Sequence, residues 1–81
     1  MVVRICFFSY FKELAGCGQA VEHLPEGSTL GELMERVRNR FPKLASMQKS
    51  TLAAVGVEYQ GKSYVLREGD EVSLFPPVQG G

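Results

Sequence analysis

The chain opens with an alternation of apolar and polar positions, the period of two that predicts a strand over residues 2–10. The apolar face of this strand should enter a core through Val3, Ile5 and Phe7. Residues 11–16 predict a short helical turn ended by glycine, and a second alternation covers residues 19–24. Two strands joined by about eight residues predict an antiparallel pair near the N-terminus.

The longest helical pattern lies in the middle of the chain. Thr29 followed by Glu32 predicts a capping box, in which two side chains satisfy backbone donors at the start of a helix. Pro42 marks its end. Apolar residues recur between them at helical spacing and should form core: Leu30, Leu33, Met34, Val37 and Phe41. The basic residues beside this stripe predict a solvated helix face, with an acidic partner as the alternative: Arg36, Arg38, Arg40 and Lys43.

The C-terminal half reads as strands and turns. Residues 51–59 form an apolar run typical of a strand, and residues 63–66 predict another short one. A turn signal at residues 67–70 precedes a clean alternation over residues 71–75, which places Val72 and Leu74 inward and Phe75 outward. The predicted order is therefore strand, strand, helix, strand, short strand, strand, within one α+β domain.

Size and charge restrict the class of protein. A chain of 81 residues, 44% of them hydrophobic, fits one small domain with one modest core. Lys+Arg and Asp+Glu both number 9, so the net charge of zero argues against a nucleic-acid partner. No apolar run approaches the roughly 18 residues of a membrane span, and the opening segment lacks a signal-peptide pattern. We expect a cytoplasmic protein with no membrane partner.

The sequence offers no catalytic constellation of its own. Two cysteines, Cys6 and Cys17, have no CxxC spacing, and His23 is the only histidine, so we expect no metal site. Without a secretion signal, two free thiols are favoured over a disulfide. His23 is expected to be an exposed strand residue. Neither a nucleophile elbow, nor a phosphate loop, nor a paired-carboxylate spacing is present, so we predict no catalytic residue in this chain.

The most unusual segment is the end, residues 75–81, which reads Phe-Pro-Pro-Val-Gln-Gly-Gly. Two prolines stiffen the root of this tail and stop the sheet, and two glycines without Cβ atoms can enter a channel too narrow for other residues. Six residues beyond Phe75 can extend about 20 Å. A terminal carboxylate becomes an electrophile only after activation, as in an acyl-adenylate, and glycine leaves it unhindered. The plain alternative is a flexible end on an ordinary domain.

The whole pattern resembles a known family. The segments that carry the resemblance are the opening at residues 7–16, the Gly-Asp-Glu-Val turn at residues 69–72 and above all the tail at residues 75–81. They are similar to the MoaD family, the ubiquitin-like sulfur-carrier subunits of molybdopterin synthase, over essentially the full chain. The resemblance implies a β-grasp (ubiquitin-like) fold over residues 1–75, with a mixed sheet of four to five strands covered by one main helix. Residues 76–81 would be an extended tail.

The resemblance also implies roles for the tail and its partners. An E1-like adenylyltransferase (MoeB-like) would use ATP to adenylate the Gly81 carboxylate, and a sulfur donor would convert it to a thiocarboxylate. The tail would then enter the large subunit of molybdopterin synthase (MoaE-like), in a heterotetramer, and give its sulfur to cyclic pyranopterin monophosphate. Catalytic side chains would belong to these partners, with no cofactor bound to this chain and no processing protease needed. The residues that would line the tail's path are Gly80, Gln79, Val78, Pro77 and Pro76.

Phe8 and Phe75 are predicted to share the sheet face away from the helix, beside the tail, and we interpret them as a partner interface. Three alternative functions remain open at this point. The chain could carry sulfur in another pathway, such as that of thiamine or cysteine, since the bare Gly-Gly end is common to several carriers. It could be a ubiquitin-like modifier joined to lysines through Gly81, or a plain binding module that tolerates loss of Gly81.

Overall fold

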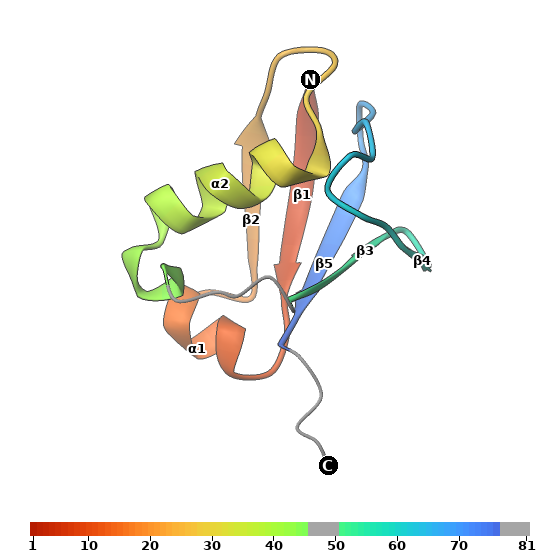
Figure 1. The fold of residues 1–81 in the computed structure, drawn as a ribbon. Coiled ribbons are helices and arrows are strands. Elements are labelled where there is room, and N and C mark those ends of the chain that lie inside the picture. The colour runs from red at the N-terminus through yellow and green to blue at the C-terminus, as the bar shows by residue number, and fades with distance from the viewer. Residues whose placement is uncertain (46–50, 77–81) are drawn as a thin grey trace.

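The computed structural model of the chain describes residues 1–45 and 51–76. Five strands form one mixed sheet, in the order β2-β1-β5-β3-β4 (Figure 1). The strands are β1 (Val2–Phe7), β2 (Gln19–His23), β3 (Leu52–Val55), β4 (Glu58–Tyr59) and β5 (Glu71–Phe75). The helices are α1 (Tyr10–Ala15), α2 (Leu30–Arg40) and the 3₁₀ turn η1 (Pro42–Leu44).

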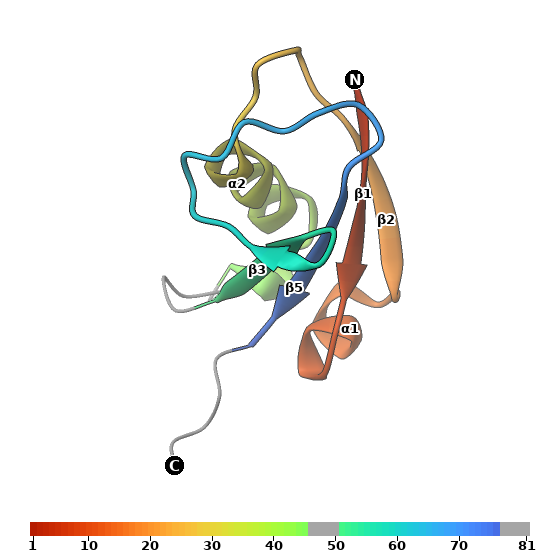
Figure 2. The ribbon, with the colours of Figure 1, turned by 90° about the vertical axis from the view of Figure 1, so that its right-hand side faces the viewer.

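The last strand lies at the centre of the sheet. β5 runs parallel to β1 on one side, with Ile5 opposite Val72, and antiparallel to β3 on the other, with Ala53 opposite Leu74. β1 also pairs with β2 as the predicted antiparallel pair. Figure 2 shows β5 between its neighbours, ending at the end of the sheet where α1 lies.

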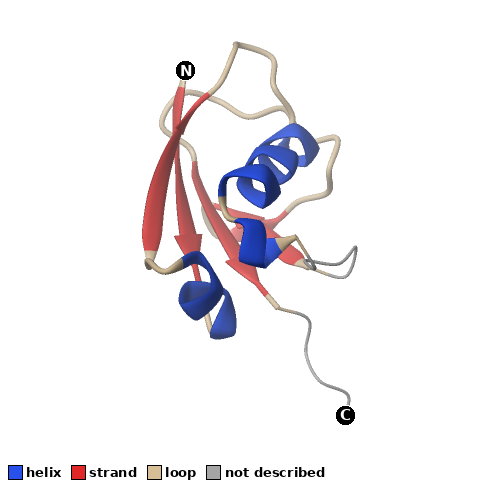
Figure 3. Ribbon diagram, turned by 90° about the vertical axis from the view of Figure 1, so that its left-hand side faces the viewer, coloured by secondary structure: helices blue, strands red, loops and turns tan. Residues whose placement is uncertain are grey.

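α2 covers one face of this sheet (Figure 3). The predicted capping box is present, because Thr29 N donates to Glu32 Oε1 at 2.8 Å and Glu32 N donates to Thr29 Oγ1 at 3.3 Å. The apolar stripe of α2 is buried as predicted, but Phe41 is only half-buried and meets Phe7 edge-on at 5.3 Å. The side chains without any exposed surface mark the centre of the core: Val3, Ile5, Leu30, Leu33, Val37, Leu44, Val72 and Leu74.

A mixed five-stranded sheet with one main helix across a single face is the β-grasp arrangement of an α+β domain, so the predicted fold class is confirmed. α1 and its glycine end are also confirmed, since Gly16 closes the helix at φ 79° with its N–H on the Lys12 carbonyl. β1 is shorter than predicted. It ends at Phe7, because Ser9 at φ 54° turns the backbone into α1.

The predicted single strand over residues 51–59 is wrong. Gly56 adopts φ 63°, a left-handed conformation that side chains disfavour, and folds the segment into a hairpin of β3 and β4. The turn places Tyr59 opposite Ala54. A continuous apolar run conceals such a turn, because hydrophobicity alone does not mark where a strand reverses.

The short strand predicted over residues 63–66 is also wrong, apart from one isolated bridge between Thr29 and Val65. This segment bonds to the start of α2 instead of to the sheet. Leu30 N donates to the Tyr64 carbonyl at 2.8 Å, and Gly31 N donates to the Lys62 carbonyl at 3.0 Å. The first free donors of the helix are thereby satisfied by a loop far along the chain.

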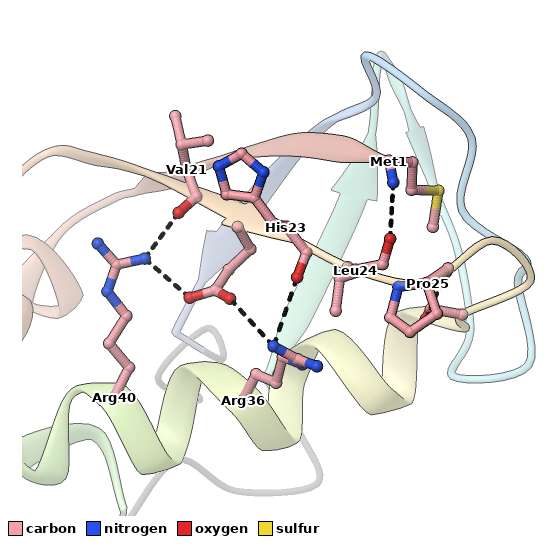
Figure 4. A network of polar contacts seen from close by, with 9 residues as sticks. Met1, Val21, His23, Leu24, Pro25, Arg36 and Arg40 are labelled. Carbon is pink, nitrogen blue, oxygen red and sulfur yellow. Dashed lines mark hydrogen bonds and ion pairs between the residues drawn. The ribbon is translucent and has the colours of Figure 1, made fainter.

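The basic residues Arg36, Arg40 and Lys43 are exposed, as predicted. Two of them, the arginines of α2, also reach across to β2. Arg40 donates to Glu22 Oε2 at 2.8 Å, and Arg36 lies 3.8 Å from the other oxygen of that carboxylate. The Glu22 side chain is only 11% exposed, so the charged group is paired where it is buried. Arg38, by contrast, pairs with Glu35 on its own helix. Figure 4 shows both arginines on the side of α2 that faces β2.

Candidate functional site

The candidate site begins where β5 ends. Val72 and Leu74 have no exposed surface and fix the strand to the core, and Phe8 N donates to the Leu74 carbonyl at 3.2 Å. Phe75 is the last strand residue and Pro76, half-buried, is the last residue described. The root of the tail is therefore held from both sides by neighbouring strands.

Three aromatic side chains gather at this root, and we call them the tail-root cluster: Phe8, Tyr59 and Phe75. The rings of Phe8 and Phe75 stack at 4.7 Å with an angle of 14° between their planes. Tyr59 meets Phe75 nearly edge-on, at 6.4 Å and 69°. Phe8 is 42% exposed and Tyr59 67% exposed, so the cluster presents aromatic surface to solvent at the end of β5.

The predicted neighbours Phe8 and Phe75 do meet, whereas sequence reasoning missed Tyr59. Its place in the cluster depends on the hairpin at Gly56, which returns the chain alongside β3. The sequence signal for this hairpin is Gly56, which interrupts the apolar run over residues 51–59 and can mark a turn. Pro76 lies next to the cluster in sequence, at the start of the tail.

The remaining predicted tail residues, Pro77, Val78, Gln79, Gly80 and Gly81, lie outside the described residues. Their roles stay predictions. The boundary between a domain over residues 1–75 and a tail over residues 76–81 likewise stays a prediction, although β5 does end at Phe75.

Other groups that could carry chemistry are not assembled for it. Cys6 and Cys17 are both free thiols, and burial, with a smaller contribution from the Glu71 carboxylate, raises the pKa of Cys6. A raised pKa keeps Cys6 in its unreactive thiol form. His23 is exposed on β2, as expected. Over residues 1–45 and 51–76, three or more metal-ligating side chains nowhere come together as a possible metal site.

A β-grasp domain whose central strand leads out, past exposed aromatic rings, into a tail ending in two glycines defines a ubiquitin-like protein. More specifically, the chain belongs to the ThiS family, whose model matches residues 5–81. The predicted resemblance to ubiquitin-like sulfur carriers is thereby confirmed at the level of the family.

Curated relatives are similar over nearly their whole length. The molybdopterin synthase sulfur carrier subunit of Chlamydomonas reinhardtii is 31% identical over 84 residues, covering 100% of both chains. The protein of the same name from Arabidopsis thaliana is 27% identical, covering 98% of this chain and 82% of the relative. The similarity therefore extends over nearly all of this chain and at least 82% of each of these relatives.

Solved structures repeat the fold. The putative molybdopterin converting factor subunit 1 of Pyrococcus furiosus is 29% identical, with a TM-score of 0.87 over 96% of this chain and 99% of that one. Small archaeal modifier protein 1 of Haloferax volcanii gives a TM-score of 0.89 at 21% identity, covering 95% and 98%. A complex of subunits 1 and 2 of the molybdopterin-converting factor from Helicobacter pylori gives 0.70 at 23%, covering 100% of both chains. The last two likenesses concern the fold alone.

Among the described residues, no helix has the length and apolar character required to cross a membrane.

Proposed function

We propose that this chain is the sulfur carrier subunit of a molybdopterin synthase, and that Gly81 is the residue that carries the sulfur. The observation that carries the proposal is the 31% identity to a sulfur carrier subunit over the full length of both chains. The ThiS family match supports it, since it extends to residue 81 and so includes the tail. The tail follows a central strand that is paired on both sides, which fits a group that must be presented to other proteins.

In this proposal, chemistry at Gly81 takes place in two steps. A carboxylate oxygen of Gly81 attacks the α-phosphorus of ATP in an E1-like adenylyltransferase, forming an acyl-adenylate and releasing pyrophosphate. A sulfur donor then displaces AMP, so that one oxygen of the carboxylate is replaced by sulfur. The absent side chains at Gly80 and Gly81 leave the carbonyl carbon open to attack. The chain contributes no catalytic residue and binds no cofactor.

The tail, now carrying sulfur as a thiocarboxylate on Gly81, then enters a large synthase subunit, along a path lined by residues 76–80. Two such transfers convert cyclic pyranopterin monophosphate to molybdopterin, within a heterotetramer. The Helicobacter pylori complex, formed by two subunits of the molybdopterin-converting factor, supports a large partner for a chain with this fold. The two free thiols are in keeping with the reducing cytoplasm, where we propose that the carrier acts.

The tail-root cluster is proposed to be the part of the domain that docks on this partner. Aromatic side chains lose little conformational entropy on binding and are enriched at interface centres. Phe8 and Tyr59 are exposed in the free chain and flank Phe75, from which the tail departs. A partner that covers both rings would also fix the direction in which the tail leaves the domain.

Intact-protein mass spectrometry tests the proposal. The chain is incubated with an E1-like adenylyltransferase, ATP and a sulfide donor, in parallel with a variant that lacks Gly81. The expected result is a mass gain of one oxygen-to-sulfur exchange, localised to Gly81 and absent from the variant. Addition of a large synthase subunit with cyclic pyranopterin monophosphate should then reverse the gain.

Three outcomes would contradict the proposal. Equal behaviour of the chain and the variant would leave a plain ubiquitin-like binding module. A thiocarboxylate that forms but is not consumed by the synthase substrate would indicate a carrier for another pathway. Isopeptide conjugates between Gly81 and lysines would indicate a protein modifier, as the name of the small archaeal modifier protein 1 of Haloferax volcanii, which shares this fold, states of that protein.

A further inference from the structure

β2 is a regular edge strand of five residues. Its inner side bonds to the N-terminal strand and its flanks, since Leu24 N donates to the Met1 carbonyl and Phe7 N donates to the Gly18 carbonyl, both at 2.9 Å. Bonded residues alternate along an antiparallel pair. Gln19, Val21 and His23 therefore direct their backbone N–H and C=O groups to the outer side. Such a row of free groups is a template for another strand.

Two of the three outer carbonyls are occupied by side chains of α2. Arg40 Nη1 donates to the Val21 carbonyl at 2.7 Å, and Arg36 Nη1 donates to the His23 carbonyl at 3.4 Å (Figure 4). The same two nitrogens contact the Glu22 carboxylate, at 2.8 Å for Arg40 and 3.8 Å for Arg36.

Glu22 is well placed to hold both arginines over the edge. Its side chain lies on the core face of β2, next to the buried Ala20 and Leu24. Burying an unpaired carboxylate is costly, and α2 supplies two guanidinium partners four residues apart. An inward-pointing charge on an edge strand is itself a known obstacle to pairing between sheets.

We propose that Arg36 and Arg40, held by Glu22, close the β2 edge of this chain to strand addition by a second copy of the same chain. β2 is self-complementary in an antiparallel two-fold arrangement centred on Val21. There Val21 would exchange both backbone hydrogen bonds with Val21 of the second copy, and Gln19 would pair with His23. No like charges face each other in this register. The Val21 side chain, 45% exposed, would add an apolar pair.

The opposite edge of the sheet does not offer the same template. β4 has only two residues, so it presents too short a row of groups for regular pairing.

Arg40 occupies the Val21 carbonyl, which is the central acceptor of the two-fold pairing. Opening this one contact would therefore expose the centre of the interface.

The test is the oligomeric state of the full chain and its variants, measured by size-exclusion chromatography with light scattering. The variant R36Q/R40Q removes both contacts to the edge, and we expect its mass to shift from monomer to dimer as protein concentration rises. The matched control is R38Q, because Arg38 lies on the same helix but pairs only with Glu35 among the described residues. R38Q and the unaltered chain should remain monomeric.

A second variant keeps the test valid if R36Q/R40Q fails to fold with its Glu22 carboxylate unpaired. E22L/R36M/R40M replaces the whole buried ion group by apolar side chains, an exchange that folded domains tolerate. Adding V21P to either dimerising variant should restore the monomer, because the Val21 N–H lies on the outer side and proline removes it without breaking bonds to β1. Monomeric variants, or dimers that persist with V21P, would overturn the proposal.

Discussion

At the scale of single residues, Tyr59 is the side chain that best separates docking from stability. It is 67% exposed and touches Phe75 by the edge of its ring. We expect Tyr59→Ala to lower the free energy of unfolding by no more than about 1 kcal/mol, since exposed aromatic contacts contribute little to folding. If the tail-root cluster docks on the partner, the same variant should slow sulfur transfer at limiting concentrations of the large subunit about tenfold or more.

Val57 provides the matched control for Tyr59. It belongs to the same hairpin and is 99% exposed. Val57→Ala should change neither the unfolding midpoint nor the transfer rate. Equal rates for the unaltered chain and Tyr59→Ala would remove Tyr59 from the interface, and equal losses in both variants would point to the hairpin as a whole.

Cys6 gives a prediction about pH. Burial raises the pKa of its thiol above the ordinary value of 9.0, so the folded state binds this proton more tightly than the unfolded state does. Its contribution to stability is complete below the unfolded pKa and is lost as pH rises through the folded pKa. Denaturant unfolding should therefore show a steeper alkaline loss of stability in the unaltered chain than in Cys6→Ala. Parallel pH profiles would contradict this assignment.

At the scale of elements, the β3–β4 hairpin is the part of the fold that sequence patterns missed. Gly56 at φ 63° makes its turn. Gly56→Ala should destabilise the domain by about 1–2 kcal/mol, because a side chain disfavours the left-handed conformation, and should also displace Tyr59. Gly61→Ala is the control, since a Cβ there meets no atom within 4 Å and φ lies outside the left-handed region. Denaturant midpoints of the two variants would show the difference.

Sequence patterns predicted the elements correctly where interactions between residues close in the chain determine the structure. Thr29 with Glu32 marked the start of α2, because their side chains can satisfy the free backbone donors there. The alternation in residues 71–75 identified β5 and its buried face. Sequence patterns failed where contacts with a residue far along the chain decide the secondary structure of a segment. Residues 63–66 resemble a strand, yet the Tyr64 carbonyl accepts a hydrogen bond from Leu30 N at the start of α2, a contact that no local pattern reveals.

The candidate site divides along the same line. The meeting of Phe8 and Phe75 was predictable, since the sequence alternation places both on the outer face of strands expected to be neighbours, although β1 itself ends at Phe7. The pairing of Arg36 and Arg40 with Glu22 was not, because a basic helix face looks the same in sequence whether it meets water or a buried carboxylate. The alternation over residues 19–24 places Glu22 on the face of Ala20 and Leu24, but the side chains that pair with it become evident only once α2 is packed above β2.

At the scale of the whole molecule, the central place of β5 has a mechanical consequence. β5 lies parallel to β1 and antiparallel to β3, bonded along both of its sides. A force that pulls on the end of β5 along its axis loads both ladders in shear, so many hydrogen bonds must fail together. An edge strand pulled outward would instead unzip one bond at a time. An enzyme can therefore pull on the tail of this chain, or withdraw the tail from a tight channel, without unfolding the domain.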